Sequence, residues 1–377
     1  YLGNGTSGIY IWGAQFVEGS LPKDYIRTET RLNIPRIDYS NGSCPSLLVE
    51  PQRTNLVTYS QQFDNAAWTK YNCSISANAT TSPDGTANAD IIVEDSTAST
   101  QHRVSISVSS TNSIHTLSVF IKQGSGTRNA YIDIGTTYCY YNFSTGVITV
   151  IGGTAIAENY GGGWYRLIMT SSSAVTPSTV YIGLANGNNE TYNGNGNSSI
   201  AFWGAQLELG SYATSYIPTT SAAVTRNADA IYKTGISSLI GQTEGVIFAD
   251  IKYDSNIGST KIITGLATGT SSFVYSFISG TTLVLSVYNS GTLQCYLTYS
   301  LPSSGRYKIA MGYKLNDFIV YVNGANVASQ ISGSVPSCSN LYLGNDFLTV
   351  YNKLEYNSAV LFPTRLTNAE LASLTTL

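Results

Sequence analysis

The chain has 377 residues, enough for two to three domains of about 150 residues, each able to bury a core without metal or disulfide support. Only 11% of the residues are charged and the net charge is −3, so no basic field exists to hold nucleic acid or an anionic membrane. No run approaches the roughly 18 consecutive apolar residues that a membrane-spanning helix needs, so we expect no membrane insertion.

A stretch near the N-terminus occurs a second time in the chain. Residues 1–28 align without a gap on residues 192–219, and 15 of the 28 positions are identical. Both copies run from a Gly/Asn turn into an apolar strand that ends in Trp12 or Trp203, followed by Gly, Ala and Gln. The second copy ends a long β region. We therefore expect residues 1–30 to be the closing strand of a preceding module plus a linker, which implies that the chain begins in mid-protein.

The remaining sequence predicts an all-β fold made of two tandem antiparallel β-sandwiches of the jelly-roll type. Residues 31–220 form the first module, in which 31–53 is a connector that packs in part. Short apolar or alternating runs follow at intervals of about ten residues, bounded by Gly, Asn, Asp or Ser, as is typical of sandwiches. Thr, Ser, Val, Ile and Tyr dominate these runs, and they favour strands over helices.

The second module spans residues 221–377, with 221–235 as its connector. The same strand rhythm resumes and ends in a single predicted helix near the C-terminus. Thr367 is its expected N-cap, and Glu370 stands three residues later as the capping-box partner.

Particular runs in both modules carry a resemblance to known families. The YVNG hairpin of residues 321–324, the LG strand of 341–345 and the final helix are similar to concanavalin A-like or laminin-G-like lectin domains. Upstream, runs such as PRIDYSNGSCPSLLVEPQRTNL and FWGAQLELGSYATSYIPT resemble bacteriophage tail or head fibre (spike) proteins, whose modules are similar to carbohydrate-binding jelly rolls. The resemblance implies a virion surface location and a homotrimer, which the few charges and broad Tyr-, Ser- and Thr-rich surfaces also suit.

Catalytic arrangements are not supported by the sequence. The ExDxE strand of related glucan-cutting enzymes is absent, and Asp250 and Asp254 are better explained as a solvated strand edge beside Lys252. His102 and His115 are expected at the surface or on a sheet face rather than as bases. We therefore predict that the chain is not an enzyme.

The sequence supports no zinc site and gives one candidate for calcium. Five scattered cysteines without CxxC spacing are expected to be reduced and mostly buried. Asp84, Asn88 and Asp90 lie within one turn and are candidates for a structural Ca²⁺, although a turn held by Asx hydrogen bonds is the favoured alternative. No cofactor is required.

Aromatic residues are the remaining candidates for ligand binding, because sugar rings stack on them. Trp12, Trp164 and Trp203 lie in apolar strands and are expected in the core. Tyr138 and Tyr140 share one face of a strand and are the candidate ligand-binding residues, with ordinary packing as the alternative. The second module contains further candidate tyrosines for ligand binding, none of which the sequence singles out: Tyr275, Tyr288, Tyr296 and Tyr299.

The leading hypothesis is a non-catalytic virion fibre or spike segment that adheres to cell-surface or extracellular polysaccharide and contacts other virion subunits. One alternative is a purely structural fibre or capsid decoration protein. Another is an accessory binding module of a polysaccharide-degrading enzyme.

Overall fold

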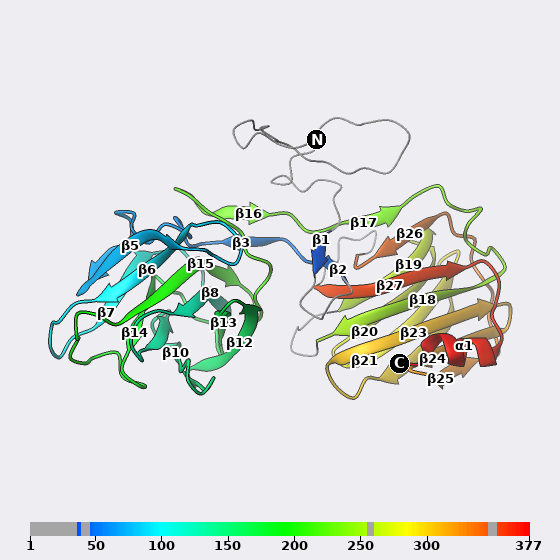
Figure 1. Ribbon diagram of the computed structural model, residues 1–377. Coiled ribbons are helices and arrows are strands. Elements are labelled where there is room, and N and C mark those ends of the chain that lie inside the picture. The colour runs from blue at the N-terminus through cyan, green and yellow to red at the C-terminus, as the bar shows by residue number, and fades with distance from the viewer. Residues whose placement is uncertain (1–35, 39–45, 255–259, 346–352) are drawn as a thin grey trace, which may run out of the picture.

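The structure is a computed structural model that describes residues 36–38, 46–254, 260–345 and 353–377. In these ranges the chain forms antiparallel sheets and one short helix near the C-terminus (Figure 1). The predicted all-β sandwich fold is thereby confirmed. The first copy of the repeat, with Trp12, lies outside the described residues, so its place in a preceding module stays a prediction.

Two six-stranded antiparallel sheets form the N-terminal sandwich (Figure 1). The first sheet has the order β11-β10-β9-β14-β7-β4, and its strands are β4 (Thr69–Tyr71), β7 (His102–Ser107), β9 (Asn129–Asp133), β10 (Tyr138–Tyr141), β11 (Ile148–Ile151) and β14 (Thr179–Ala185). The second sheet has the order β12-β13-β8-β15-β6-β5, and its strands are β5 (Cys73–Thr80), β6 (Ala89–Glu94), β8 (His115–Gln123), β12 (Gly153–Gly161), β13 (Trp164–Ser171) and β15 (Ser199–Leu209). Inward side chains of both sheets form one core, because alternate residues of each strand point to the same side.

The repeated sequence explains how β15 is fixed in its sheet. β15 lies between β6 and β8, and its Trp203 is 5% exposed. The chain then folds back so that the ring of Tyr216 lies 4.7 Å from that of Trp203. Gln206 Oε1 accepts a hydrogen bond of 2.7 Å from the backbone of Ile217, and Gly204 has a φ of +65° at a register shift. All five of these residue types recur at the matching positions of the N-terminal copy.

Two sheets also form the C-terminal sandwich. The seven-stranded sheet has the order β1-β2-β27-β18-β23-β24-β25, with β1 (Arg36–Asp38), β2 (Ser46–Val49), β18 (Glu244–Tyr253), β23 (Gly305–Lys314), β24 (Asp317–Val322), β25 (Ala325–Gln330) and β27 (Leu354–Phe362). The six-stranded sheet has the order β17-β26-β19-β20-β21-β22, with β17 (Ile231–Lys233), β19 (Lys261–Gly269), β20 (Ser272–Ser279), β21 (Thr282–Asn289), β22 (Thr292–Ser300) and β26 (Asn340–Leu343). A second core lies between them.

The helix α1 (Asn368–Thr375) covers part of the outer surface of the seven-stranded sheet (Figure 1). Thr367 is its N-cap, and the capping box with Glu370 is present, as the sequence predicts. Its Leu371 is fully buried against Phe248 and Tyr321 of the sheet. None of the helices in the described ranges is long and apolar enough to cross a bilayer.

The chain passes between the two sandwiches twice. Strands β1 and β2 belong to the predicted connector of residues 31–53, yet β2 pairs with β27 and so extends a sheet of the C-terminal sandwich. The chain next enters the N-terminal sandwich through β3 (Arg53–Asn55). It leaves again through β16 (Val224–Arg226), which pairs with β3 as a two-stranded ribbon. The two crossings therefore lie side by side.

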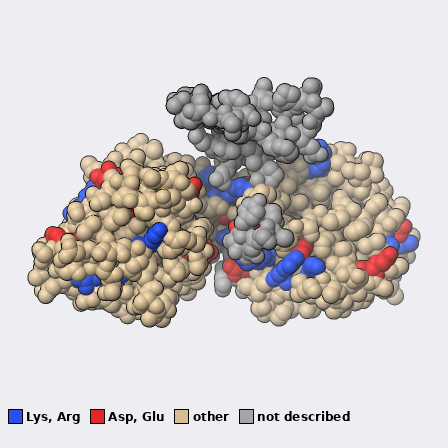
Figure 2. All heavy atoms as spheres, in the orientation of Figure 1, with Lys and Arg blue, Asp and Glu red and all other residues tan. Residues whose placement is uncertain are grey.

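A buried carboxylate, that of Glu50, joins the two crossings to both sandwiches. It is 0% exposed and lies 2.5 Å from the guanidinium of Arg36 on β1 and 3.0 Å from that of Arg226 on β16. It also accepts hydrogen bonds from the backbone of Ser215 in the N-terminal sandwich. Asp229 completes this group, because it binds Arg36 and accepts from the backbone of Glu50. Figure 2 shows few charged side chains on the visible surface, and several of them lie near this junction.

We expect Glu50→Ala to lower the free energy of unfolding by about 3–5 kcal/mol, because Arg226 would lose its carboxylate partner and Arg36 would keep only Asp229. Chemical denaturation of purified protein measures the loss. Glu158→Ala is the matched control, since Glu158 is exposed on the edge strand β12, and its effect should stay below about 0.5 kcal/mol. Equal losses in both variants would contradict the role assigned to Glu50.

The same carboxylate should make stability depend on pH. Burial by itself raises the pKa of Glu50, but the charges of Arg226, Arg36 and Lys353 outweigh it and hold the pKa below its ordinary value. Since the folded pKa is the lower one, the stabilisation is fully present above the unfolded value of about 4.3 and is lost as pH falls through the folded value. The melting-temperature gap between the wild type and Glu50→Gln should therefore be widest near neutral pH and shrink below about pH 4. A gap that is constant with pH would refute this assignment.

Candidate functional site

The outer surface of the first sheet of the N-terminal sandwich carries a group of side chains that we call the tyrosine face. Its members are Arg103 on β7, Tyr131 and Asp133 on β9, Tyr138 and Tyr140 on β10, and Tyr181 on β14. The strand register places them in two adjacent rows across four strands. The alternate residues, such as Ile132 and Ile182, point into the core. The predicted pair on β10 is therefore turned away from the core.

Two tyrosines form the floor of this face. The rings of Tyr131 and Tyr140 stack with centroids 5.3 Å apart, and the residues are only 3% and 4% exposed. Tyr131 donates a hydrogen bond of 2.6 Å to Asp133, and Tyr140 donates one of 2.5 Å to Glu190. Burial, together with these carboxylates, raises the pKa of both hydroxyls, so both remain neutral donors. The prediction that Tyr140 offers its ring to a ligand is corrected here, because its neighbours cover that ring.

The accessible part of the tyrosine face consists of side chains that stand on this floor. Tyr138 is half-buried, and its ring meets that of Tyr140 edge-on at a centroid distance of 5.9 Å. Tyr181 is also half-buried, and the guanidinium of Arg103 lies 3.9 Å from its ring centroid. Next to the tyrosine face, Tyr71 on the edge strand β4 is 44% exposed, and its ring centroid lies 5.8 Å from that guanidinium. This combination presents aromatic rings and a cation together at the surface.

Asp133 links the tyrosine face to a pocket next to it. One carboxylate oxygen accepts from Tyr131, and the other accepts from the backbone of Gly135 in the turn after β9. Burial raises the pKa of Asp133, although these two hydrogen bonds and the charge of Arg103 oppose the shift. Gly135 has a φ of +100°, a conformation that glycine adopts most readily, and this lets the chain reverse directly above the carboxylate.

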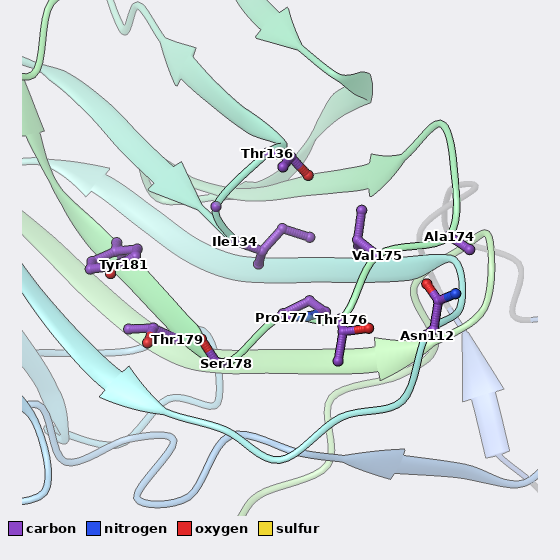
Figure 3. A pocket seen from close by; sticks show the side chains of 11 residues that line it. Asn112, Ile134, Thr136, Ala174, Val175, Thr176, Pro177, Ser178, Thr179 and Tyr181 are labelled. Carbon is purple, nitrogen blue, oxygen red and sulfur yellow. The ribbon is translucent and has the colours of Figure 1, made fainter.

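The pocket has a volume of about 390 Å³, within the usual range for small-ligand sites. Figure 3 shows the side chains that surround it. Its lining residues are Asn112, Ile134, Gly135, Thr136, Ala174, Val175, Thr176, Pro177, Ser178, Thr179 and Tyr181. No lining residue is charged, and hydroxyl and amide groups alternate with small apolar surfaces. Tyr181 belongs to both the pocket and the tyrosine face, so the two form one continuous site.

Backbone pairing outside the named strands holds one wall of the pocket. Val175 and Ser113 exchange two backbone hydrogen bonds, of 2.8 and 3.1 Å. Ser178 accepts a backbone bond of 2.9 Å from Val108, and the hydroxyl of Ser110 donates to Pro177 over 2.7 Å. The segment before β14 is therefore fixed against the loop between β7 and β8, and the pocket does not depend on a ligand to take shape.

The three calcium candidates are not brought together as ligands. Asp84 accepts from Ser82, Thr86 and Asn88, which is the alternative of a turn held by Asx hydrogen bonds. Asp90 is 1% exposed and accepts instead from the backbone N–H groups of Phe63 and Asn78. In the part of the chain that the structure describes, no cluster of three or more His, Cys, Asp or Glu residues could hold a metal ion.

The residues considered for catalysis lie deeper than predicted. His102 and His115 are both 0% exposed, so the expectation of surface positions is wrong and the alternative of an inward sheet face holds. Asp250 is not a solvated edge residue either, because it is 3% exposed and lies 2.5 Å from Arg306. The four described cysteines are free, and three of them are buried, while Cys44 lies outside the described residues.

The tyrosines of the C-terminal sandwich do not form an equivalent site. Tyr275 is 5% exposed, whereas Tyr296 on β22 is 52% exposed. Tyr299 packs against the core, and the ring of Tyr288 stacks on Phe273 at 4.9 Å. The pocket of about 390 Å³ adjoins the tyrosine face and not these side chains.

Comparison with known proteins gives no family assignment. No protein-family model matches the chain, and no curated protein sequence matches it. The receptor-binding domain of botulinum neurotoxin C/D mosaic serotype overlaps 39% of this chain and 40% of its own, at 12% identity and a TM-score of 0.33. The binding domain of botulinum neurotoxin DC in complex with rat synaptotagmin II overlaps 38% and 39%, at 14% identity and a TM-score of 0.32. The chain thus spans about two fifths of these domains, and scores this low carry no argument about function.

We expect Tyr140→Ala to destabilise the protein by about 3 kcal/mol or more, because it removes a buried ring from the floor. Tyr140→Phe keeps the ring and should lose only about 1 kcal/mol, the usual worth of one hydrogen bond. Thermal unfolding distinguishes the two variants. Tyr71→Ala serves as the exposed control and should change stability by about 1 kcal/mol or less. If Tyr140→Ala proved as mild as the control, Tyr140 would not be part of the floor.

Proposed function

We propose that the chain is a non-catalytic segment of a virion surface fibre or spike, and that its N-terminal sandwich adheres to host or environmental glycans. The observation that carries the proposal is the continuity of the tyrosine face with the uncharged pocket through Tyr181. The two surfaces together offer what a sugar chain needs: flat rings beside short hydroxyl and amide groups, with the cation of Arg103 next to them.

Each part of the site has a role in this proposal. The rings of Tyr138 and Tyr181 stack on the C–H faces of sugar rings, and Thr136, Thr176 and Ser178 exchange hydrogen bonds with sugar hydroxyls in the pocket. The floor below supplies rigidity, so that little side-chain entropy is lost on binding. Single contacts of this kind are weak, so we expect affinities between about millimolar and micromolar, with repetition along a trimeric fibre adding avidity.

The virion surface location and the trimer belong to the proposal through the sequence resemblance. A purely structural fibre is the main alternative, and it would need neither the pocket nor half-buried rings beside it. An accessory module of a polysaccharide-degrading enzyme would bind through the same surface, so the complete reading frame discriminates that alternative. The deep burial of His102, His115 and Asp250 supports a non-catalytic role for the described part of the chain.

We expect the intact protein to bind at least one class of glycan on an array, and Tyr181→Ala or Tyr138→Ala to weaken that binding about five- to tenfold. One lost aromatic contact is worth about 1 kcal/mol, which gives this factor. Titration calorimetry with the best array ligand measures it.

Tyr296→Ala is the matched control for this experiment, because Tyr296 is an exposed tyrosine on the other sandwich. It should bind as the wild type does. A blank array for the intact multimer, with its size checked by light scattering, would leave the structural-fibre alternative in place.

A further inference from the structure

Arg103 differs from the other arginines of the described ranges in what its guanidinium contacts. The others each donate to a carboxylate, carbonyl or side-chain oxygen: Arg36, Arg53, Arg128, Arg166, Arg226, Arg306 and Arg365. The guanidinium of Arg103 instead lies over aromatic rings and forms no hydrogen bond or ion pair within the described residues. Its Nε is buried without a hydrogen-bond partner, which is also true of several of the other arginines. A guanidinium has five N–H donors, and because Arg103 is half-buried, the donors of its terminal nitrogens are accessible from the surface and available to a ligand.

The sheet holds this guanidinium in place. Arg103 lies directly opposite Gly183 on β14, where a Cβ atom would be 2.5 Å from the Cβ of Arg103. Because glycine leaves this space open, the arginine stem can lie close to the neighbouring strand and carry its head over the ring of Tyr181. Stacking of this kind uses the face of the planar group and leaves the in-plane N–H donors available.

The carboxylates of the same surface have other donors. Asp133 accepts from Tyr131 and from the backbone of Gly135, and Glu190 accepts from Tyr140. Neither forms an ion pair with Arg103. The site is therefore built with its own acidic groups engaged below the surface and one planar cation held beside the rings of Tyr71 and Tyr181.

We propose that Arg103 binds the carboxylate of an acidic sugar, of the uronic or sialic acid class, whose ring stacks on Tyr181. The planar fork of arginine matches a carboxylate through two parallel hydrogen bonds, and partial removal from water strengthens such a pair. This inference rests on the proposed glycan-binding function and names its ligand class. It assigns the pocket beyond Tyr181 to neutral hydroxyls of the adjoining sugar units, since no lining residue there is charged.

The test uses an array of oligosaccharides that contain glucuronic, galacturonic or sialic acid, each printed beside its carboxyl methyl ester. The ester has the same ring and hydroxyl groups but no charge. We expect the wild-type protein to bind at least one acid at least tenfold more tightly than its ester. Arg103→Gln should abolish this preference, so that the acid and the ester bind equally weakly. Arg103→Lys keeps the charge without the fork and should recover only part of the preference.

Arg53→Gln is the matched control, because Arg53 also lies over a tyrosine, Tyr212, at 4.9 Å but outside the site. It should keep the full preference for the acid. Thermal unfolding of each variant verifies folding, and Arg103→Lys carries the test if Arg103→Gln does not fold. Equal binding of acids and esters by the wild type, or an undiminished preference in Arg103→Gln and Arg103→Lys, would overturn the inference while leaving glycan binding intact. Failure to bind any glycan would overturn both.

Discussion

The buried carboxylate of Glu50 is the contact on which the arrangement of the two sandwiches depends. It lies where the two chain crossings run side by side, and its partners come from a strand of the C-terminal sheet, from the ribbon and from the N-terminal sandwich. A carboxylate that is withdrawn from water is stabilising only while its cations stay in place, and the cations have the same requirement. The group therefore fixes one relative position of the three segments. Although the chain has few charged residues, several of them meet at this junction, where they hold the crossing segments together.

The two-residue period of the strands explains why the proposed binding surface and a core are found on opposite faces of the same sheet. Along β9, β10 and β14 every second residue joins the core, and the residues between them include the four tyrosines of the opposite face. A tyrosine suits this position, because its ring can pack on its neighbours while its hydroxyl finds a partner. The buried pair then holds the half-buried pair in position. The same strands thus supply the buried tyrosines that stabilise the sheet and the half-buried tyrosines of the proposed binding surface.

Much of the fold could be predicted from the sequence, since its signals are local. The strand rhythm, the turn residues and the capping box of α1 each act over a few residues. The same holds for the side of the sheet on which Tyr138 and Tyr140 lie. The side chains that cover a sheet face come from residues distant in the sequence, so the burial of Tyr140, His102 and Asp250 could not be deduced. Tyr131 and Tyr181 were missed for a related reason, because their meeting with Arg103 requires the order of strands in the sheet, and no short motif specifies that order. The sole local sign was the glycine at position 183 within an otherwise regular strand, which indicates close approach of a neighbour.

The return segment after β15 has a further consequence for how such sequences are divided into domains. The contacts among Trp203, Gln206 and Tyr216 span few residues, so this unit can be recognised in a sequence without knowledge of its distant partners. The WGAQ run that begins at Trp203, followed about ten residues later by the Tyr-Ile pair at 216–217, therefore marks where the N-terminal sandwich ends and the connector to the C-terminal sandwich begins. In this chain the position of that mark can be read from the amino-acid sequence alone.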